Sequence, residues 1–220
     1  MAKKPPRRTA ERILETSQEL FNRYGEPNVS TTAISAEMRI SPGNLYYHYP
    51  AKDELINALF TRFDVALQEA LQQCSLARTV NDASLSLHRL LELVWQYRFF
   101  YRDLNHLMSR NRQLEAAVQP LIDRKQHALQ EMLRGLRSEA LLDIDDQGIT
   151  DTSNSMVVMA TYWISFEYAR NPRQALEPES AQQALSRGVQ LVLNLLKPYL
   201  HPRVRSGLAP TQPAAVELTA

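Results

Sequence analysis

The 220-residue sequence contains a single cysteine, Cys74, and only six glycines. A lone cysteine excludes an intramolecular disulfide and argues against a cysteine-based zinc site. The sequence also has no glycine-rich phosphate loop, no nucleophile-elbow pattern and no paired-carboxylate motif. These absences argue against an enzyme, and we expect no cofactor.

Long apolar runs are missing as well, and none approaches the length of a membrane span. The N-terminus is basic, as a signal peptide would be, but Glu11, Arg12 and Glu15 interrupt every candidate apolar core. We therefore expect a cytoplasmic protein with no membrane partner.

Clusters of metal-ligating side chains are also sparse. His88 and Glu92 stand four residues apart, which is a common spacing by chance. Asp143, Asp145 and Asp146 lie close in sequence but lack the spacing and the terminal glutamate of a calcium-binding loop. We predict a solvated turn there and no metal site.

Charge is distributed unevenly along the chain. Residues 1–52 contain eight Lys or Arg and five Asp or Glu, a balance of +3, so the other 168 residues carry −2 of the whole-chain charge of +1. The basic tail, residues 1–8, is suited to contacts with a nucleic-acid backbone. The alternative is a solvated tail that happens to be basic.

The most informative segment of the chain is residues 31–49, which reads as two short helices separated by a tight turn. Ile34 and Met38 stand four residues apart and form an apolar stripe on the first helix. Ser41 can cap the second helix, with Pro42 at its first position, where the missing N–H costs nothing.

The second short helix has few residues that can face inward. Leu45 is the main candidate, and Tyr49 stands four residues later. The remaining positions face outward and are rich in hydrogen-bonding and aromatic groups. Helix-turn-helix proteins lay such a second helix in the major groove of DNA.

The rest of the chain also has helical patterns. Scarce glycine and the lack of long strand-like alternation predict an all-α protein. We expect helices over about residues 9–24, 51–74, 85–95, 99–108, 114–141 (with a kink at Pro120), 150–170 and 179–199. The buried face of the first helix is expected to carry Ile13, Ser17, Leu20, Phe21 and Tyr24, and Gly25 should end it.

Residues 156–168 are apolar on several sides of their expected helix. A helix that is apolar nearly all round must be buried nearly all round. With the apolar last helix, this pattern favours a helical bundle between two subunits. The alternative is that both helices pack only on their own core.

Residues 95–103 combine five aromatic side chains with two arginines. Such a segment can line a pocket for a ligand with an apolar body and a polar or anionic end. It can equally be a helix junction that seals the core while the arginines extend outward. The candidate ligand-binding residues are Trp95, Phe99, Arg102, Tyr162, Trp163 and Phe166.

Residues 41–49, followed by 52–55, resemble the DNA-binding region of the TetR (tetracycline-repressor) family of bacterial transcriptional regulators. The match covers roughly residues 13–60. Two positions depart from the family pattern. Arg39 stands in the turn where glycine is frequent, and Ser35 stands where alanine is usual.

The resemblance implies a three-helix DNA-binding head over residues 1–50 (the head) and a helical ligand-binding and dimerisation body over residues 51–200 (the body). We expect residues 201–220 to form a loose tail. Carried over residue by residue, the family's base-contacting positions are Thr32, Pro42, Gly43, Asn44 and Tyr47. Its phosphate-contacting positions are Thr31, Tyr46, His48 and Lys52. Ser41, the cap of the second short helix, completes the set of candidate DNA-binding residues.

The function that this resemblance implies is that of a dimeric regulator of transcription, most simply a repressor. It would bind a palindromic operator in double-stranded DNA and leave it when a small-molecule effector, not identified by the sequence, binds the body. The alternative is a helical ligand-binding or catalytic protein whose helix-turn-helix does not bind DNA.

Overall fold

The computed structural model describes residues 6–172 and 178–205. These residues form helices and no β-strand, so the predicted all-α class is confirmed. The α-helices are α1 (Pro6–Tyr24), α2 (Thr31–Glu37), α3 (Pro42–His48), α4 (Lys52–Ser75), α5 (Val80–Gln96), α6 (Arg98–Arg102), α7 (Leu104–Arg110), α8 (Arg112–Ser138), α9 (Asp146–Arg170), α10 (Ala181–Asn194) and α11 (Pro202–Arg205). The short 3-10 helices are η1 (Glu26–Asn28), η2 (Pro178–Ser180) and η3 (Lys197–Tyr199).

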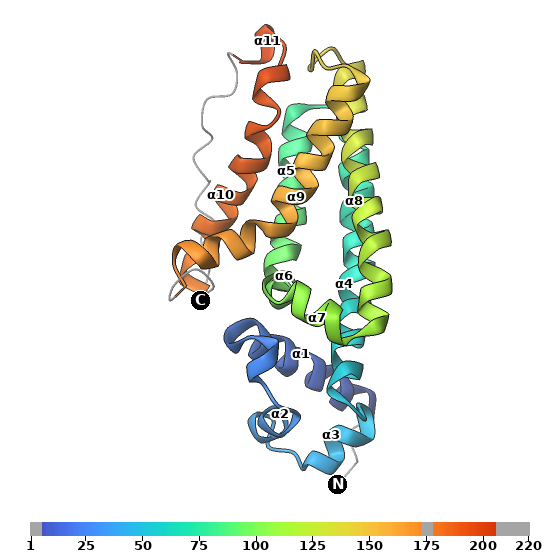
Figure 1. The fold of residues 1–220 in the computed structure, drawn as a ribbon, viewed down its shortest axis with the longest axis vertical. Coiled ribbons are helices and arrows are strands. Elements are labelled where there is room, and N and C mark those ends of the chain that lie inside the picture. The colour runs from blue at the N-terminus through green and yellow to red at the C-terminus, as the bar shows by residue number, and fades with distance from the viewer. Residues whose placement is uncertain (1–5, 173–177, 206–220) are drawn as a thin grey trace.

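The head contains α1, α2 and α3, and α4 runs from it into the body (Figure 1). In α1, Ile13 and Phe21 are fully buried, and the Ser17 hydroxyl donates to the Ile13 carbonyl oxygen over 2.6 Å. Gly25 follows with a φ of 88°, a left-handed conformation that favours glycine. The prediction that Tyr24 is buried is wrong. It is 50% exposed because α1 ends there and the chain turns away.

In the body, α4 and α8 pack side by side, and α5, α9 and α10 pack against one another beside them (Figure 1). The helix α8 continues through Pro120 as one element, in agreement with the single helix predicted over residues 114–141, although it ends at Ser138. The predicted helix over residues 99–108 is instead two helices, α6 and α7, which meet at Asp103.

Two boundaries near the ends of α9 and α10 also differ from prediction. The helix α9 begins before Thr150 because Asp145 caps it, with its Oδ1 accepting from the Gly148 N–H over 2.7 Å. The predicted loose tail begins with the helical turn α11, and residues 206–220 lie outside the described residues. Within the described ranges, no helix has both the length and the apolar character needed to cross a bilayer.

Candidate nucleic-acid interface

Both helices of the predicted helix-turn-helix begin at a serine cap. The Ser30 Oγ accepts a hydrogen bond from the Ala33 N–H over 3.1 Å at the start of α2. The Ser41 Oγ accepts from the Asn44 N–H over 3.2 Å at the start of α3, and Pro42 follows at the first helical position. These caps satisfy N–H groups that a helix start leaves without partners. The predicted role of Ser41 as a cap is confirmed.

The turn between the two helices passes through Arg39 in a left-handed conformation, with a φ of 55°. The Arg39 N–H donates to the Ala36 carbonyl oxygen over 3.0 Å, and the Ile40 N–H donates to that of Ser35 over 3.0 Å. This pair of bonds is the Schellman pattern that ends many helices, usually with glycine at the left-handed position. Arg39 therefore adopts the backbone conformation that glycine usually has in this turn, and this lowers the stability of the fold by about 1 kcal/mol.

The helix α3 has one buried side and one exposed side. Leu45 is fully buried in the head, as predicted, and Tyr49 is half-buried. Tyr47 is 80% exposed, the strongest exposure among the large apolar and aromatic side chains that the structure describes in the head. The predicted base-contacting residues are all exposed, and they are Thr32, Pro42, Gly43, Asn44 and Tyr47.

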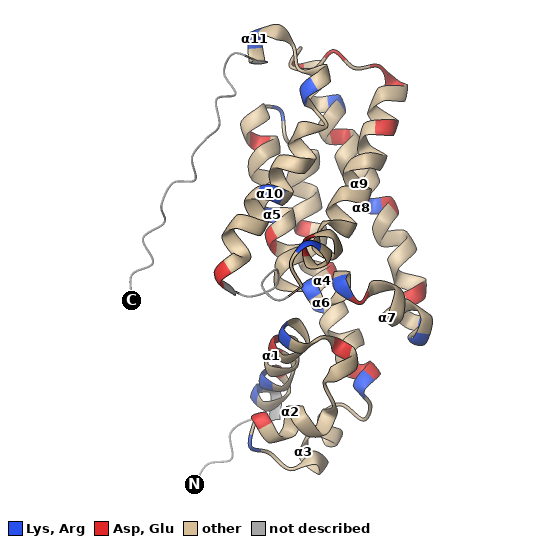
Figure 2. Cartoon of the chain, turned by 60° about the vertical axis from the view of Figure 1, so that its left-hand side comes forward, with Lys and Arg blue, Asp and Glu red and all other residues tan. Residues whose placement is uncertain are grey.

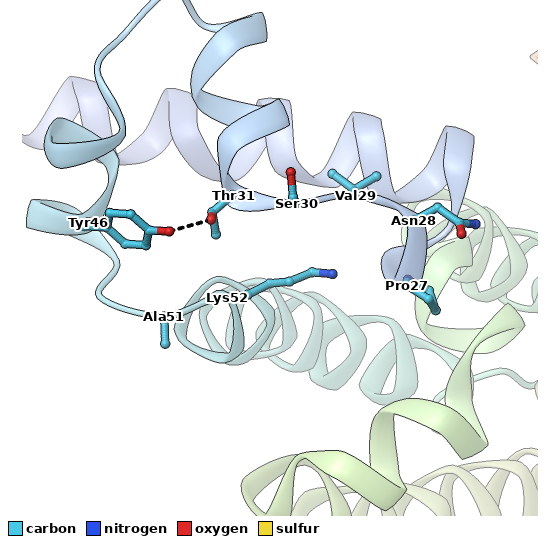
Figure 3. A pocket seen from close by; sticks show the side chains of 8 residues that line it. All are labelled: Pro27, Asn28, Val29, Ser30, Thr31, Tyr46, Ala51 and Lys52. Atoms are coloured by element: carbon cyan, nitrogen blue, oxygen red, sulfur yellow. Dashed lines mark hydrogen bonds between the residues drawn. The ribbon is translucent and has the colours of Figure 1, made fainter.

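Two of the predicted phosphate-contacting residues, Thr31 of α2 and Tyr46 of α3, are in direct contact. The hydroxyls of Thr31 and Tyr46 are 2.9 Å apart and hydrogen-bonded, which joins the start of α2 to α3 (Figure 3). The His48 ring is half-buried and packs edge-on against the Tyr47 ring at a centroid distance of 5.2 Å. These contacts orient polar groups along the outer surface of the head.

Lys52, at the start of α4, is held by Glu26 of η1. Its Nζ lies 2.6 Å from Glu26 Oε1 and donates to the Glu26 carbonyl oxygen, also over 2.6 Å. The ammonium group that we predict to contact a phosphate therefore already has two partners. The Lys52 side chain borders a groove of about 480 Å³ (Figure 3). The groove is lined by Pro27, Asn28, Val29, Ser30, Thr31, Tyr46, Ala51 and Lys52.

Charge on the head lies beside α3, not on it. The sequence of α3 contains no Lys, Arg, Asp or Glu, whereas α1 carries both signs (Figure 2). Arg8 and Arg39 are exposed. Of the predicted basic tail, Arg7 and Arg8 are part of α1, and Lys3 and Lys4 lie outside the described residues. The neutral hydrogen-bonding groups of α3 suit contacts with base edges. The cations on the neighbouring segments suit contacts with the flanking phosphates.

Comparison with known families covers nearly the whole described chain. A model of the tetR family of bacterial regulatory proteins matches residues 13–59, and a TetR model described as a bacterial transcriptional repressor matches residues 62–208. The chain belongs to the TetR family of bacterial transcriptional regulators.

The chain is also similar to individual known proteins. The HTH-type transcriptional regulator UidR of Escherichia coli K12 is 43% identical over 51 residues, which are 23% of this chain and 26% of UidR. The chain thus aligns with about a quarter of that regulator's length. A TetR-family regulator from Marinobacter aquaeolei VT8 has 28% identity and a TM-score of 0.81, over 90% of this chain and 94% of that one. A putative transcriptional regulator from Saccharomonospora viridis, solved in complex with choline, has 18% identity and a TM-score of 0.65, over 87% of this chain and 96% of that one.

In this TetR-family chain, the predicted effector residues Phe99 and Arg102 lie between head and body. The Phe99 ring packs on Phe21 of α1 at a centroid distance of 5.3 Å, and its N–H donates to Asn22 Oδ1 over 3.1 Å. An Arg102 Nη2 donates to the Phe21 carbonyl oxygen over 3.1 Å and pairs with Asp103 at 3.2 Å. These two residues join α6 to α1 and do not line a pocket with the other four.

The other predicted effector residues divide between core and surface. Trp95 and Trp163 are buried and stack on each other at 6.3 Å, whereas Tyr162 and Phe166 are about half exposed on another side of α9. The three candidate residues of α9 therefore do not face the same side of the helix. Successive α-helix positions differ by about 100° in direction, so neighbours in sequence face different ways.

Sequence reasoning missed a buried lysine in the body. Lys125 is 1% exposed and stands on the buried stripe of α8, between Leu121 and Leu129. A lysine at an inward position of an amphipathic helix was a visible departure from the pattern. Among the residues that the structure describes, no three His, Cys, Asp or Glu side chains are placed to hold a metal ion.

Proposed function

We propose that this TetR-family regulator binds a palindromic operator in double-stranded DNA as a homodimer. It represses transcription there, and a small molecule bound in the body releases it. The proposal assigns the chain no catalytic activity and places it in the cytoplasm. The observation that carries it is the exposed surface of α3, where Asn44 and Tyr47 stand exposed on a helix capped by Ser41.

The head suits major-groove contact because its exposed groups are held by buried ones. Leu45 and Ile34 are fully buried and hold α3 against α2. The Asn44 side chain, exposed at the first turn of α3, offers both a donor and an acceptor to a base edge. The family resemblance supports Asn44 as a base-contacting residue.

The homodimer is supported by an apolar stripe on α9. Val158, Tyr162 and Phe166 recur every four residues, and their exposed fractions are 58%, 47% and 52%. We predicted that this helix would be buried nearly all round, and in the single chain it is buried on one side. A second copy related by a twofold axis would cover the stripe with an identical one.

Release by an effector requires that the body set the separation of the two heads. Recognition helices of a dimer enter successive major grooves when they are about 34–36 Å apart. In this chain, α4 and the α1–α6 contacts connect head and body. A small molecule that prefers another arrangement of these helices shifts the dimer away from DNA by its differential affinity. The choline complex of the Saccharomonospora viridis regulator supports a small-molecule effector as a class.

The test is selection of bound duplexes from a random DNA pool, followed by mobility shift with wild type and variants. Asn44→Ala should weaken discrimination at one or two base positions by about 1–3 kcal/mol. The matched control is Asn105→Ala, which removes an exposed asparagine in α7, far from α3 in sequence. If the wild type selects no sequence, or Asn44→Ala selects the same one equally well, the proposal is wrong.

A further inference from the structure

The body contains a small apolar cavity where α4, α6, α7, α8 and α9 meet. Its volume is about 20 Å³, which is enough for roughly one water molecule. Most of its lining is aromatic or aliphatic, and the residues are Phe60, Phe63, Phe100, Tyr101, Leu104, Leu114, Val118, Leu121, Ile122, Lys125 and Thr161.

The charged residue in this lining is Lys125. Its Nζ donates to Tyr101 Oη over 3.0 Å and lies 4.8 Å from the centre of the Tyr101 ring. Burial lowers the lysine pKa to about 7, because the charged form is poorly solvated there. None of the residues that line the cavity carries a carboxylate. The ammonium form therefore has no anionic partner in the cavity and retains unused donors.

A second polar group in the cavity lacks a partner. Thr161 is 4% exposed, and its Oγ1 makes no hydrogen bond. A buried hydroxyl without a partner is uncommon and costs stability. An amine with unused donors and a hydroxyl without a partner thus border one apolar space, on the facing helices α8 and α9.

We propose that this cavity is the effector site and that the effector is an organic acid, a carboxylate on an apolar body. The inference rests on the proposed function, since it names the chemical class of that effector. The carboxylate pairs with the Lys125 ammonium and accepts from the Thr161 hydroxyl. The apolar body lies among the phenylalanines and leucines.

A carboxylate fits this site better than the other common charged or polar groups. A cationic ligand would place like charges together in a poorly solvated space. A neutral amide would leave the ammonium of Lys125 without its counter-charge. A carboxylate supplies both the counter-charge for the Lys125 ammonium and an acceptor for the Thr161 hydroxyl. Charge-assisted hydrogen bonds of this kind are stronger than those between neutral groups.

The position of the cavity couples ligand entry to the head. An acid larger than a water molecule must displace lining side chains, because packed interiors hold little spare volume. Phe60 and Phe63 belong to α4, which leads to Lys52 and the head. Phe100 stands next to Phe99, whose ring contacts Phe21 of α1. Filling the cavity therefore moves the two connections between head and body.

The test is titration calorimetry of the full chain with a panel of acids and their matched amides. The panel runs from hexanoate to dodecanoate and from benzoate to phenylbutyrate. At least one acid should bind about 10- to 100-fold more tightly than its amide. Lys125→Met should remove that preference, and Thr161→Val should reduce it. Lys197→Met, which changes an exposed lysine in η3, should leave it unchanged.

Outcomes of this experiment separate the ligand class from the proposed function, because DNA binding is measured independently by mobility shift. If the protein binds selected DNA but no acid is preferred over its amide, the inference is wrong and the proposed function stands. Retained preference in Lys125→Met also overturns it. If acids bind as expected and the protein binds no DNA, the proposed function fails while the acid site is supported.

Discussion

Replacing Lys125 with methionine should make the folded protein more stable at neutral and acidic pH. The two side chains have similar length and shape, so the substitution keeps the packing against the cavity and removes the charge. Lys125 is 1% exposed, and burial lowers its pKa from 10.5 to about 7. The unfolded chain keeps the ordinary lysine pKa and so binds the proton more tightly than the folded chain.

The size and sign of the effect follow from these two pKa values. Each pH unit of difference corresponds to about 1.4 kcal/mol, so a fall from 10.5 to about 7 destabilises the fold by up to roughly 5 kcal/mol below pH 7. The penalty decreases as the pH rises from 7 to 10.5, where the folded lysine is neutral and the unfolded one is still charged. Methionine also leaves the Tyr101 hydroxyl without its partner, at a cost of about 1–3 kcal/mol. The expected net gain at pH 6 is roughly 2–4 kcal/mol.

Urea unfolding at pH 6 and pH 9, with one protein concentration throughout, measures this effect. The advantage of Lys125→Met over wild type should shrink by about 3 kcal/mol between the two pH values. Lys197→Met should stay within about 0.5 kcal/mol of wild type at both, because that lysine is exposed. A variant less stable than wild type at pH 6, or a gap that does not change with pH, would refute this account of the buried lysine.

Three further predictions concern the head and the dimer. Arg39→Gly should raise the free energy of unfolding by about 1 kcal/mol, because the residue has a φ of 55°, and a lower melting temperature would contradict this. Phe166→Lys should dissociate the proposed dimer in sedimentation experiments, whereas Tyr24→Lys, at a similarly exposed aromatic of the head, should not. Deleting residues 1–8 should reduce the salt dependence of DNA binding by about 0.9 in log–log slope for each lost phosphate contact, and an unchanged slope would exclude the proposed role of the tail.

The helix-turn-helix was predictable because its determinants are local. Ser41 and Pro42 favour a helix start by their own chemistry, and the four-residue spacing of Ile34 and Met38 selects the buried face. The structure confirms the cap and the burial of both apolar side chains. The left-handed Arg39 was the one local feature that its residue type did not predict.

The proposed effector site could not be predicted in the same way. Aromatic side chains near residues 95–103 were compatible with a pocket or with a sealed junction, and sequence spacing does not distinguish the two. Phe99 contacts Phe21 from α1, and Trp95 stacks on Trp163 from α9, so the outcome depends on partners more than 60 positions away.

The amino-acid sequence alone was enough to predict most of the helical segments, the capped helix-turn-helix and the exposed polar side of α3, whereas the division of residues 98–110 into α6 and α7 was not predicted. Hydrogen bonds between near neighbours and the period of the helix carry that information. Packing between distant helices was needed to place Phe99 in the joint between head and body and to bring Lys125 and Thr161 to one cavity. Burial, and with it the lowered pKa of Lys125, is a property of the space between helices, which no local pattern encodes.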